Sequence, residues 1–343
     1  MRRYLPLFCL SFILVVIAVA VMNMLDGYAG KQRPENIKTL SVYTSLPVEQ
    51  VSILAAEYEK VNGIHINISP LPPQELLTRV FTERNAPKAD IVLADSSVLD
   101  EARKAGLLAA FTTEQTDIVP DRFREKESFW YGLWYDIFVF AVNRDAAKLL
   151  PKEAVKWADL VNSKYRLAMT DFVASEAAAH LLYTLVSVQG EEQAVAYLTK
   201  LHPQVMQYSK FLATPPRMAG MGEADIAVAV QSEALRYEKE GFPIKIVYPK
   251  DGTAYYLTGA GIIKDAVASA DAKTFIDWLL QENAQTILLN NKFYFISCNP
   301  ETVSAKEFAK KDVELLEIAD TFTPAQENKV LERWIKSVRL MPR

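Results

Sequence analysis

The sequence contains few of the residues that most often form covalent cross-links or bind metals. Its 343 residues include only two cysteines and three histidines. Cys9 lies within an apolar N-terminal run, so removal of that run would leave Cys298 alone and exclude an intramolecular disulfide. The histidines, His65, His180 and His202, are too widely separated to form a metal-ligand motif. We therefore expect neither a resident metal nor a cofactor.

Catalytic and nucleic-acid signatures are also missing. The sequence has no G-x-S-x-G, H-E-x-x-H, Walker or G-x-G-x-x-G motif. Its acidic pair Glu191-Glu192 begins a predicted helix, where it compensates the helix dipole. The net charge is -4 and the basic residues are scattered, whereas nucleic-acid binders usually carry a basic stripe. We predict neither an enzyme nor a nucleic-acid-binding protein.

The first thirty residues have the composition of an export signal. Arg2 and Arg3 precede an apolar run from Leu5 to Ala20, which ends in the small-x-small triplet Ala18-Val19-Ala20. This order is typical of a cleaved signal peptide. The apolar stretch also extends to Met24, which is long enough for a retained membrane anchor. Both interpretations of residues 1–30 place the rest of the chain outside the cytoplasm, in the periplasm or its equivalent.

Beyond this segment, strands and helices are predicted to alternate. A buried strand from Thr39 to Tyr43 is followed by an amphipathic helix from Val48 to Val61, closed by Asn62-Gly63. Further strands, including Ala89 to Asp95 and Ala224 to Val230, are again followed by helical patterns. Such a series predicts an α/β protein with mostly parallel strands and helices on both faces. Its ligands are expected beyond the carboxyl ends of the strands, where helices begin.

Five stretches, in order, resemble a known family. They are "LSVYTSLPVEQVSILAAEYEKVNGIHINI", "KADIVLADSSVLDEARKAGLL", "YGLWYDIFVFAVNRD", "GEADIAVAVQSEALRYEKEG" and "VYPKDGTAYYLTGAGIIKDAVASADAKTFIDWLLQENAQ". Together they span about Leu40 to Asn299 and resemble the extracellular solute-binding proteins of ABC importers. Within that family the chain is most similar to the group of ferric-ion, sugar-phosphate and phosphonate binders.

The resemblance implies a two-lobed periplasmic-binding fold of the second type, with a ligand cleft between the lobes. Lobe one would comprise 38–134 and 262–300, lobe two 138–256, and C-terminal helices 301–343. The chain would cross near Tyr135–Phe138 and Leu257–Gly261. It would act as a monomeric receptor that passes a small polar or anionic solute to a permease in the inner membrane. The sequence does not assign the C-terminal helices to a lobe.

The expected cleft residues lie at strand-to-helix junctions and at the hinge. Arg217, in the first turn of a predicted helix, suits an anionic ligand, although simple exposure would also explain it. Several hydroxyls here are good helix caps without a ligand, and the aromatic residues could simply be packed. Tyr255 and Tyr256 should face opposite sides of one strand. The predicted set is Thr44, Ser45, Asp95, Ser96, Ser97, Trp134, Tyr135, Asp136, Ser175, Thr214, Arg217, Gln231, Ser232, Tyr255 and Tyr256.

Two alternative functions remain open on the sequence. Ferric binders of the family use adjacent tyrosines where this chain has Gln231 and Ser232, and a histidine where it has Thr44-Ser45-Leu46. That departure argues against a bare ferric ion but leaves an iron importer as an alternative. A retained anchor would instead fit a membrane-tethered sensor or scaffold that kept the fold.

Overall fold

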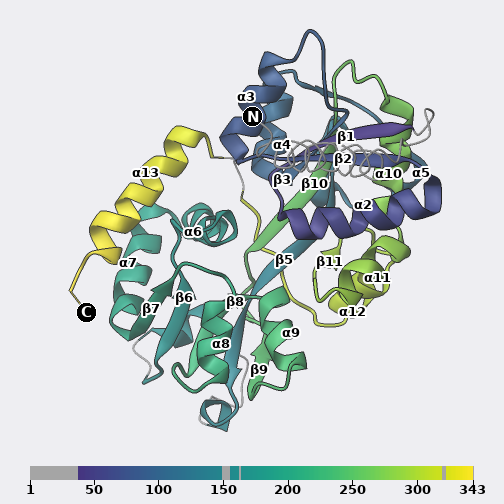
Figure 1. Ribbon diagram of the computed structural model, residues 1–343. Helices are drawn as coiled ribbons and strands as arrows, with labels where there is room; N and C mark the ends of the chain where they lie inside the picture. The colour runs from purple at the N-terminus through teal and green to yellow at the C-terminus, as the bar shows by residue number, and fades with distance from the viewer. Residues whose placement is uncertain (1–37, 149–154, 162–163, 319–321, 343) are drawn as a thin grey trace, which may run out of the picture.

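The computed structural model describes residues 38–148, 155–161, 164–318 and 322–342. It is an α/β protein of two lobes joined by two long strands (Figure 1). The main path of the sheet has the order β2-β1-β3-β10-β5-β8-β6-β7. The predicted export segment 1–30 lies outside the described residues. Within them, no helix is both long and apolar enough to span a membrane.

Lobe one is built on three parallel strands that continue into the antiparallel strand β10. The predicted helix after the first strand is present as α2, and Gly63 ends it in the left-handed conformation with φ 69°. The strands of this lobe are β1 (Thr39–Thr44), β2 (His65–Pro70), β3 (Ile91–Asp95), β4 (Leu108–Ala109) and β11 (Ile296–Ser297). Its helices are α2 (Val48–Asn62), α3 (Pro73–Thr82), α4 (Ser96–Lys104), α5 (Glu114–Asp117), α10 (Ser269–Leu280), α11 (Glu282–Asn290) and α12 (Val303–Ala309).

Lobe two contains the second parallel group, in which β6 lies between β7 and β8. Its strands are β6 (Leu167–Thr170), β7 (Val205–Ser209), β8 (Ile226–Val230) and β9 (Ile244–Val247). Its helices are α6 (Glu176–Gln189), α7 (Glu191–Leu201), α8 (Thr214–Gly220) and α9 (Gln231–Lys239). Short 3-10 turns lie in this lobe at Ala146–Lys148, Trp157–Leu160 and His202–Gln204, and in lobe one at Asp121–Phe123.

The C-terminal helix belongs with lobe two, which the sequence left open. Helix α13 (Pro324–Trp334) lies beside α6 and α7 (Figure 1) and continues into a π-helical turn, Ile335–Arg339. Val330, Trp334 and Val338 are buried in the same core as the apolar face of α6. Trp334 also donates a hydrogen bond from its indole nitrogen to Asp171 Oδ1 at 3.2 Å. The end of the chain therefore stabilises lobe two.

The long strands β5 (Trp130–Asn143) and β10 (Tyr255–Ile263) hold the lobes together. Strand β5 pairs with β10 up to Ile137 and with β8 from Phe138 onward. The change of partner therefore falls at Ile137 and Phe138, inside one continuous strand. The exact lobe limits given above stay a prediction.

One prediction concerns the close approach of these two strands at Gly259. The pairing register shifts at Thr258 and Gly259, and a Cβ on Gly259 would lie 2.4 Å from the Tyr131 carbonyl oxygen. We expect Gly259→Ala to lower the free energy of unfolding by about 3 kcal/mol, because backbone must move. Gly63→Ala should lower the free energy of unfolding by only about 1 kcal/mol. An alanine there would be strained by the left-handed φ, but its Cβ would clash with no neighbouring atom. Urea titration of both variants tests this, and equal losses would contradict it.

Candidate functional site

A cavity of about 530 Å³ opens between the two lobes beside the joining strands. We call it the hinge cavity. Its walls come from the starts of α2, α6 and α9, from β5 and β10, and from the loop after α11. This size is ordinary for a small-molecule site. Six predicted residues line it: Ser45, Trp134, Asp136, Ser175, Ser232 and Tyr256.

The start of α2 enters the hinge cavity without a side-chain cap. Its N-cap residue is Pro47, which cannot cap through a side chain, so the first helical N–H groups are left for another acceptor. Gln50 lines the cavity here, is only 2% exposed, and its Nε2 has no hydrogen-bond partner in the described structure. Ser45 also lines this end. The arrangement offers N–H donors to an acceptor group on a ligand.

Asp136 links the hinge to lobe two. The backbone nitrogen of Ser232, at the start of α9, donates to Asp136 Oδ1 at 3.0 Å, and the Ser232 hydroxyl donates to Oδ2. Burial raises the pKa of Asp136 to about 7, although the two bonds from Ser232 oppose the rise. The donors at the start of α9 are thus already bonded to the Asp136 carboxyl group, so they are not free to bind an anionic ligand.

The start of α6 brings a carboxylate to the cavity. Ser175 caps this helix by accepting from the Ala178 backbone nitrogen at 3.1 Å. Glu176 is the next residue; it lines the cavity and is exposed. Partial removal of the Glu176 carboxyl group from water raises its pKa, and the negative charge of Asp95 on lobe one raises it further. Within the described residues Glu176 has no ion-pair partner.

Aromatic side chains form one wall of the hinge cavity. Trp134 on β5 stacks with Phe295 at a ring separation of 6.3 Å, and Phe293 continues the stack. Tyr256 on β10 meets the His180 ring edge-on at 6.1 Å. Phe293 and Phe295 follow α11 in lobe one, whereas His180 lies on α6 in lobe two. His180 does not itself line the hinge cavity, so the aromatic wall comes from the two joining strands and the loop after α11.

A second cavity of about 500 Å³, the outer cavity, lies on the other face of β10. Tyr255 lines it while Tyr256 lines the hinge cavity, so the two tyrosines face opposite sides as expected of neighbouring strand residues. Ser96 and Ser97 lie here as well. Because the two tyrosines line different cavities, they cannot coordinate the same metal ion.

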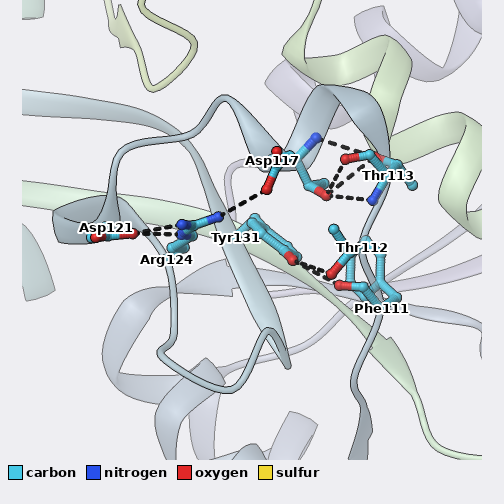
Figure 2. Close-up of polar contacts among 8 residues, drawn as sticks. Phe111, Thr112, Thr113, Asp117, Asp121, Arg124 and Tyr131 are labelled. Carbon is cyan, nitrogen blue, oxygen red and sulfur yellow. Dashed lines mark hydrogen bonds and ion pairs between the residues drawn. The ribbon is translucent and has the colours of Figure 1, made fainter.

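The arginines of the outer cavity are already paired. Arg124 lies between Asp121, at 2.6 Å, and Asp117, at 3.7 Å (Figure 2). Arg122 reaches Glu317 at 3.1 Å. The neighbouring Tyr131 hydroxyl donates to the Phe111 carbonyl at 2.7 Å, which fixes the adjoining loop to β5 (Figure 2). These ion pairs engage Arg122 and Arg124, and the hinge cavity, which is lined by both lobes and the joining strands, is therefore the stronger candidate for a ligand site.

The remaining predicted residues line neither cavity. Thr44 is fully buried and donates to the Leu93 carbonyl at 2.9 Å, and Asp95 caps α4 by accepting from Ser97 and Val98. These are internal roles, as expected of good caps. The others are Tyr135, buried against Phe123; Gln231, buried at the start of α9; and Thr214 and Arg217 on α8.

The anion role suggested for Arg217 finds no geometric support. Its side chain is exposed, lies 3.7 Å from the Met221 sulfur, and lines neither cavity. Helix α8 is buried through Pro215, Pro216 and Met218, so Arg217 takes the outward-facing position. Simple exposure accounts for it.

Sequence reasoning missed the cavity residues that do not end a strand or cap a helix. Gln50 and Glu176 lie within first helical turns, and Lys292 and Phe293 lie in the loop after α11. A signal for Gln50 was present, because it is polar at a position that the helix period places inward, next to Val51 and Leu54. The α11 loop had no such signal, since its approach depends on the tertiary fold.

Within the described ranges, no group of three or more His, Cys, Asp or Glu side chains is arranged to hold a metal ion. The one cysteine described, Cys298, is buried, and burial raises its pKa well above its usual range. A thiol in that state is a poor nucleophile. The residues that line the hinge cavity can supply hydrogen bonds, charge and aromatic contact.

Known proteins resemble this chain in sequence. A family model described as bacterial extracellular solute-binding protein matches residues 86–314. An uncharacterized protein of Haemophilus influenzae is 29% identical over 275 residues, covering 76% of this chain and 80% of its own length.

Solved structures show the same fold. The periplasmic binding protein AfuA of Actinobacillus pleuropneumoniae, with fructose-6-phosphate bound, aligns with a TM-score of 0.71 at 23% identity. The alignment covers 89% of this chain and all of AfuA. Iron-bound HitA of Pseudomonas aeruginosa aligns with a TM-score of 0.73 at 21% identity, over 86% of this chain and 98% of HitA. These two share a fold but hold different ligands, so fold alone does not name the solute.

Proposed function

Because the chain belongs to the bacterial extracellular solute-binding proteins, we propose that its hinge cavity captures a small polar solute and that the closed form delivers it to an ABC-type permease. The observation that carries this proposal is the composition of the cavity wall. Lobe one supplies Ser45 and Gln50, the hinge supplies Asp136, and lobe two supplies Ser175 and Ser232. A ligand that contacts all three parts stabilises the closed arrangement over the open one.

The same geometry favours binding without turnover. The polar groups that line the cavity are hydroxyls, carboxylates, amides and two cations, Lys292 and Arg236, each of which is paired with a glutamate. Among the described residues, no cysteine or histidine lines the cavity. A histidine lies nearby, but His180 meets Tyr256 through its ring edge, and burial lowers its pKa to about 4. We propose a receptor that acts alone as a monomer in the periplasm, with no chemical step.

A blocking substitution tests the location of the site. Ser45→Tyr should weaken solute binding more than tenfold, because the larger side chain would fill the mouth of the cavity beside α2. Ser52→Tyr is the matched control, since Ser52 is exposed on the same helix and lines neither cavity. Binding would be found by thermal unfolding of the full chain against sugar phosphates, carboxylates, amines and ferric citrate, then quantified by calorimetry.

Saturation at about one hundred times the dissociation constant should add about 2.7 kcal/mol to the stability of the wild-type chain. Equal binding by Ser45→Tyr and the wild type would place the site elsewhere. Stabilisation by ferric citrate alone would favour the iron alternative. No stabilisation by any compound would remove the receptor function and favour a tethered sensor.

A further inference from the structure

We infer that the solute of the hinge cavity is bipolar: an acidic or oxo group seated at the start of α2 on lobe one, and a protonated amine facing Glu176 on lobe two. This inference rests on the proposed receptor function and specifies its solute class. It follows from what each end of the cavity leaves unpaired. The two ends of the cavity belong to different lobes, so a solute that contacts both ends would also favour closure of the lobes.

The acceptor-binding end is defined by α2. This helix has fifteen residues, no side-chain cap at Pro47, and first-turn N–H groups directed out of its start. The amide of Gln50 is a second and independent sign of a ligand, because its Nε2 is buried and unpaired among the described atoms while the residue lines the cavity. A buried donor without a partner costs about 1–3 kcal/mol, and an acceptor oxygen on the solute would recover part of this.

One charge opposes an anion at this end. Glu49 lines the cavity in the first turn of α2 and is exposed. Lys292 lines the cavity too, but it is engaged with Glu240 at 2.9 Å. The acid group is therefore held by N–H donors and not by a free cation, and Glu49 makes the seat selective against high negative charge.

The amine-binding end is defined by Glu176. Its carboxylate lines the cavity without an ion-pair partner among the described residues, while Asp95 adds negative charge nearby. The other lining cation, Arg236, is held by Glu233 at 2.8 Å. Tyr256, which lines the same cavity and lies close enough to Glu176 to feel its charge, adds an aromatic ring that also favours an ammonium group.

Bridging both ends links solute choice to closure. A simple anion would contact lobe one but leave Glu176 without a counter-charge, whereas a simple amine would leave the start of α2 and Gln50 unfilled. Only a solute with both groups gains from both lobes at once. The closed population should therefore rise most with a zwitterion.

Matched probes test the inference by calorimetry on the full chain. Three sets each compare a zwitterion with its two halves: glucosamine 6-phosphate with glucose 6-phosphate and glucosamine; 4-aminobutyrate with butyrate and butylamine; taurine with ethanesulfonate and ethylamine. In at least one set the zwitterion should bind at least tenfold tighter than either half. If every zwitterion bound no tighter than its acidic half, or if the amines alone bound best, the bipolar solute would be overturned but not the receptor function. Failure of every compound would contradict both.

Two glutamate substitutions in the same cavity should act in opposite directions. Glu176→Gln should weaken the best zwitterion at least tenfold and leave its amine-free half unchanged. Glu49→Gln should tighten both the zwitterion and the acidic half, because it removes the opposing charge. Equal effects of the two variants, or an unchanged affinity in Glu176→Gln, would contradict the assignment of the ends. Thermal unfolding without solute confirms that each variant is folded.

Discussion

Replacing Trp134 with alanine should lower the free energy of unfolding by about 3–5 kcal/mol and abolish solute binding. Trp134 is 1% exposed and is among the largest fully buried side chains of the described structure. It lies on β5 opposite Thr258, where the register between β5 and β10 shifts, and it stacks with Phe295. Its loss would leave a cavity where the two lobes meet and remove one wall of the hinge cavity.

Trp134→Phe is the control, because it keeps an aromatic ring against Phe295. It should recover most of the lost stability and part of the binding. Urea unfolding measures the first quantity and calorimetry the second. If Trp134→Ala were as stable as the wild type, Trp134 would not be closely packed at the hinge. If it bound solute normally, Trp134 would not belong to the site.

The second large effect is a pH dependence that Asp136→Asn should remove. The pKa of Asp136 is about 7 in the folded chain against 3.8 as its ordinary value. Between these two values the folded state keeps a proton that the unfolded state has lost. The contribution of Asp136 to stability therefore falls as the pH rises through this window, by on the order of 4 kcal/mol in total, and changes no further above it.

Asp136→Asn has no such proton to lose, so its stability should fall less between pH 4 and 7. The test is the difference between variant and wild type in urea unfolding, since Glu327, whose pKa is also raised to about 7, titrates in both proteins. Asp265→Asn, at an exposed turn, is the control and should follow the wild type. A stability difference between Asp136→Asn and the wild type that stayed constant across this window would contradict the buried, proton-holding Asp136.

The fold could be predicted where the hydrophobic period was strong. Strand β1 and helix α2 begin at the expected residues, and each runs one residue beyond the end of its predicted range. Strand β7 was missed, because Val205–Ser209 follows a proline turn and has two exposed residues, which weakens its pattern. The place of α13 could not be predicted, since its attachment depends on Trp334 reaching Asp171 across the fold.

The sequence predicted the part of the candidate site that lies where strands end and helices begin. The rule that ligands gather beyond strand ends selected Ser45, Ser175 and Ser232, which come together in the hinge cavity. The same rule selected Thr44 and Asp95, which bond internally. Sequence alone does not show which of two adjacent polar residues turns inward. It also did not reveal the charge of the cavity, because that depends on which carboxylates find partners.

The most direct test of this account is a crystal structure of the full chain with the solute that stabilises it most. The account predicts the solute in the hinge cavity, with an acceptor group at the start of α2 near Gln50 and a contact to Glu176 on the facing lobe. Solute bound in the outer cavity, or held by one lobe alone, would contradict it.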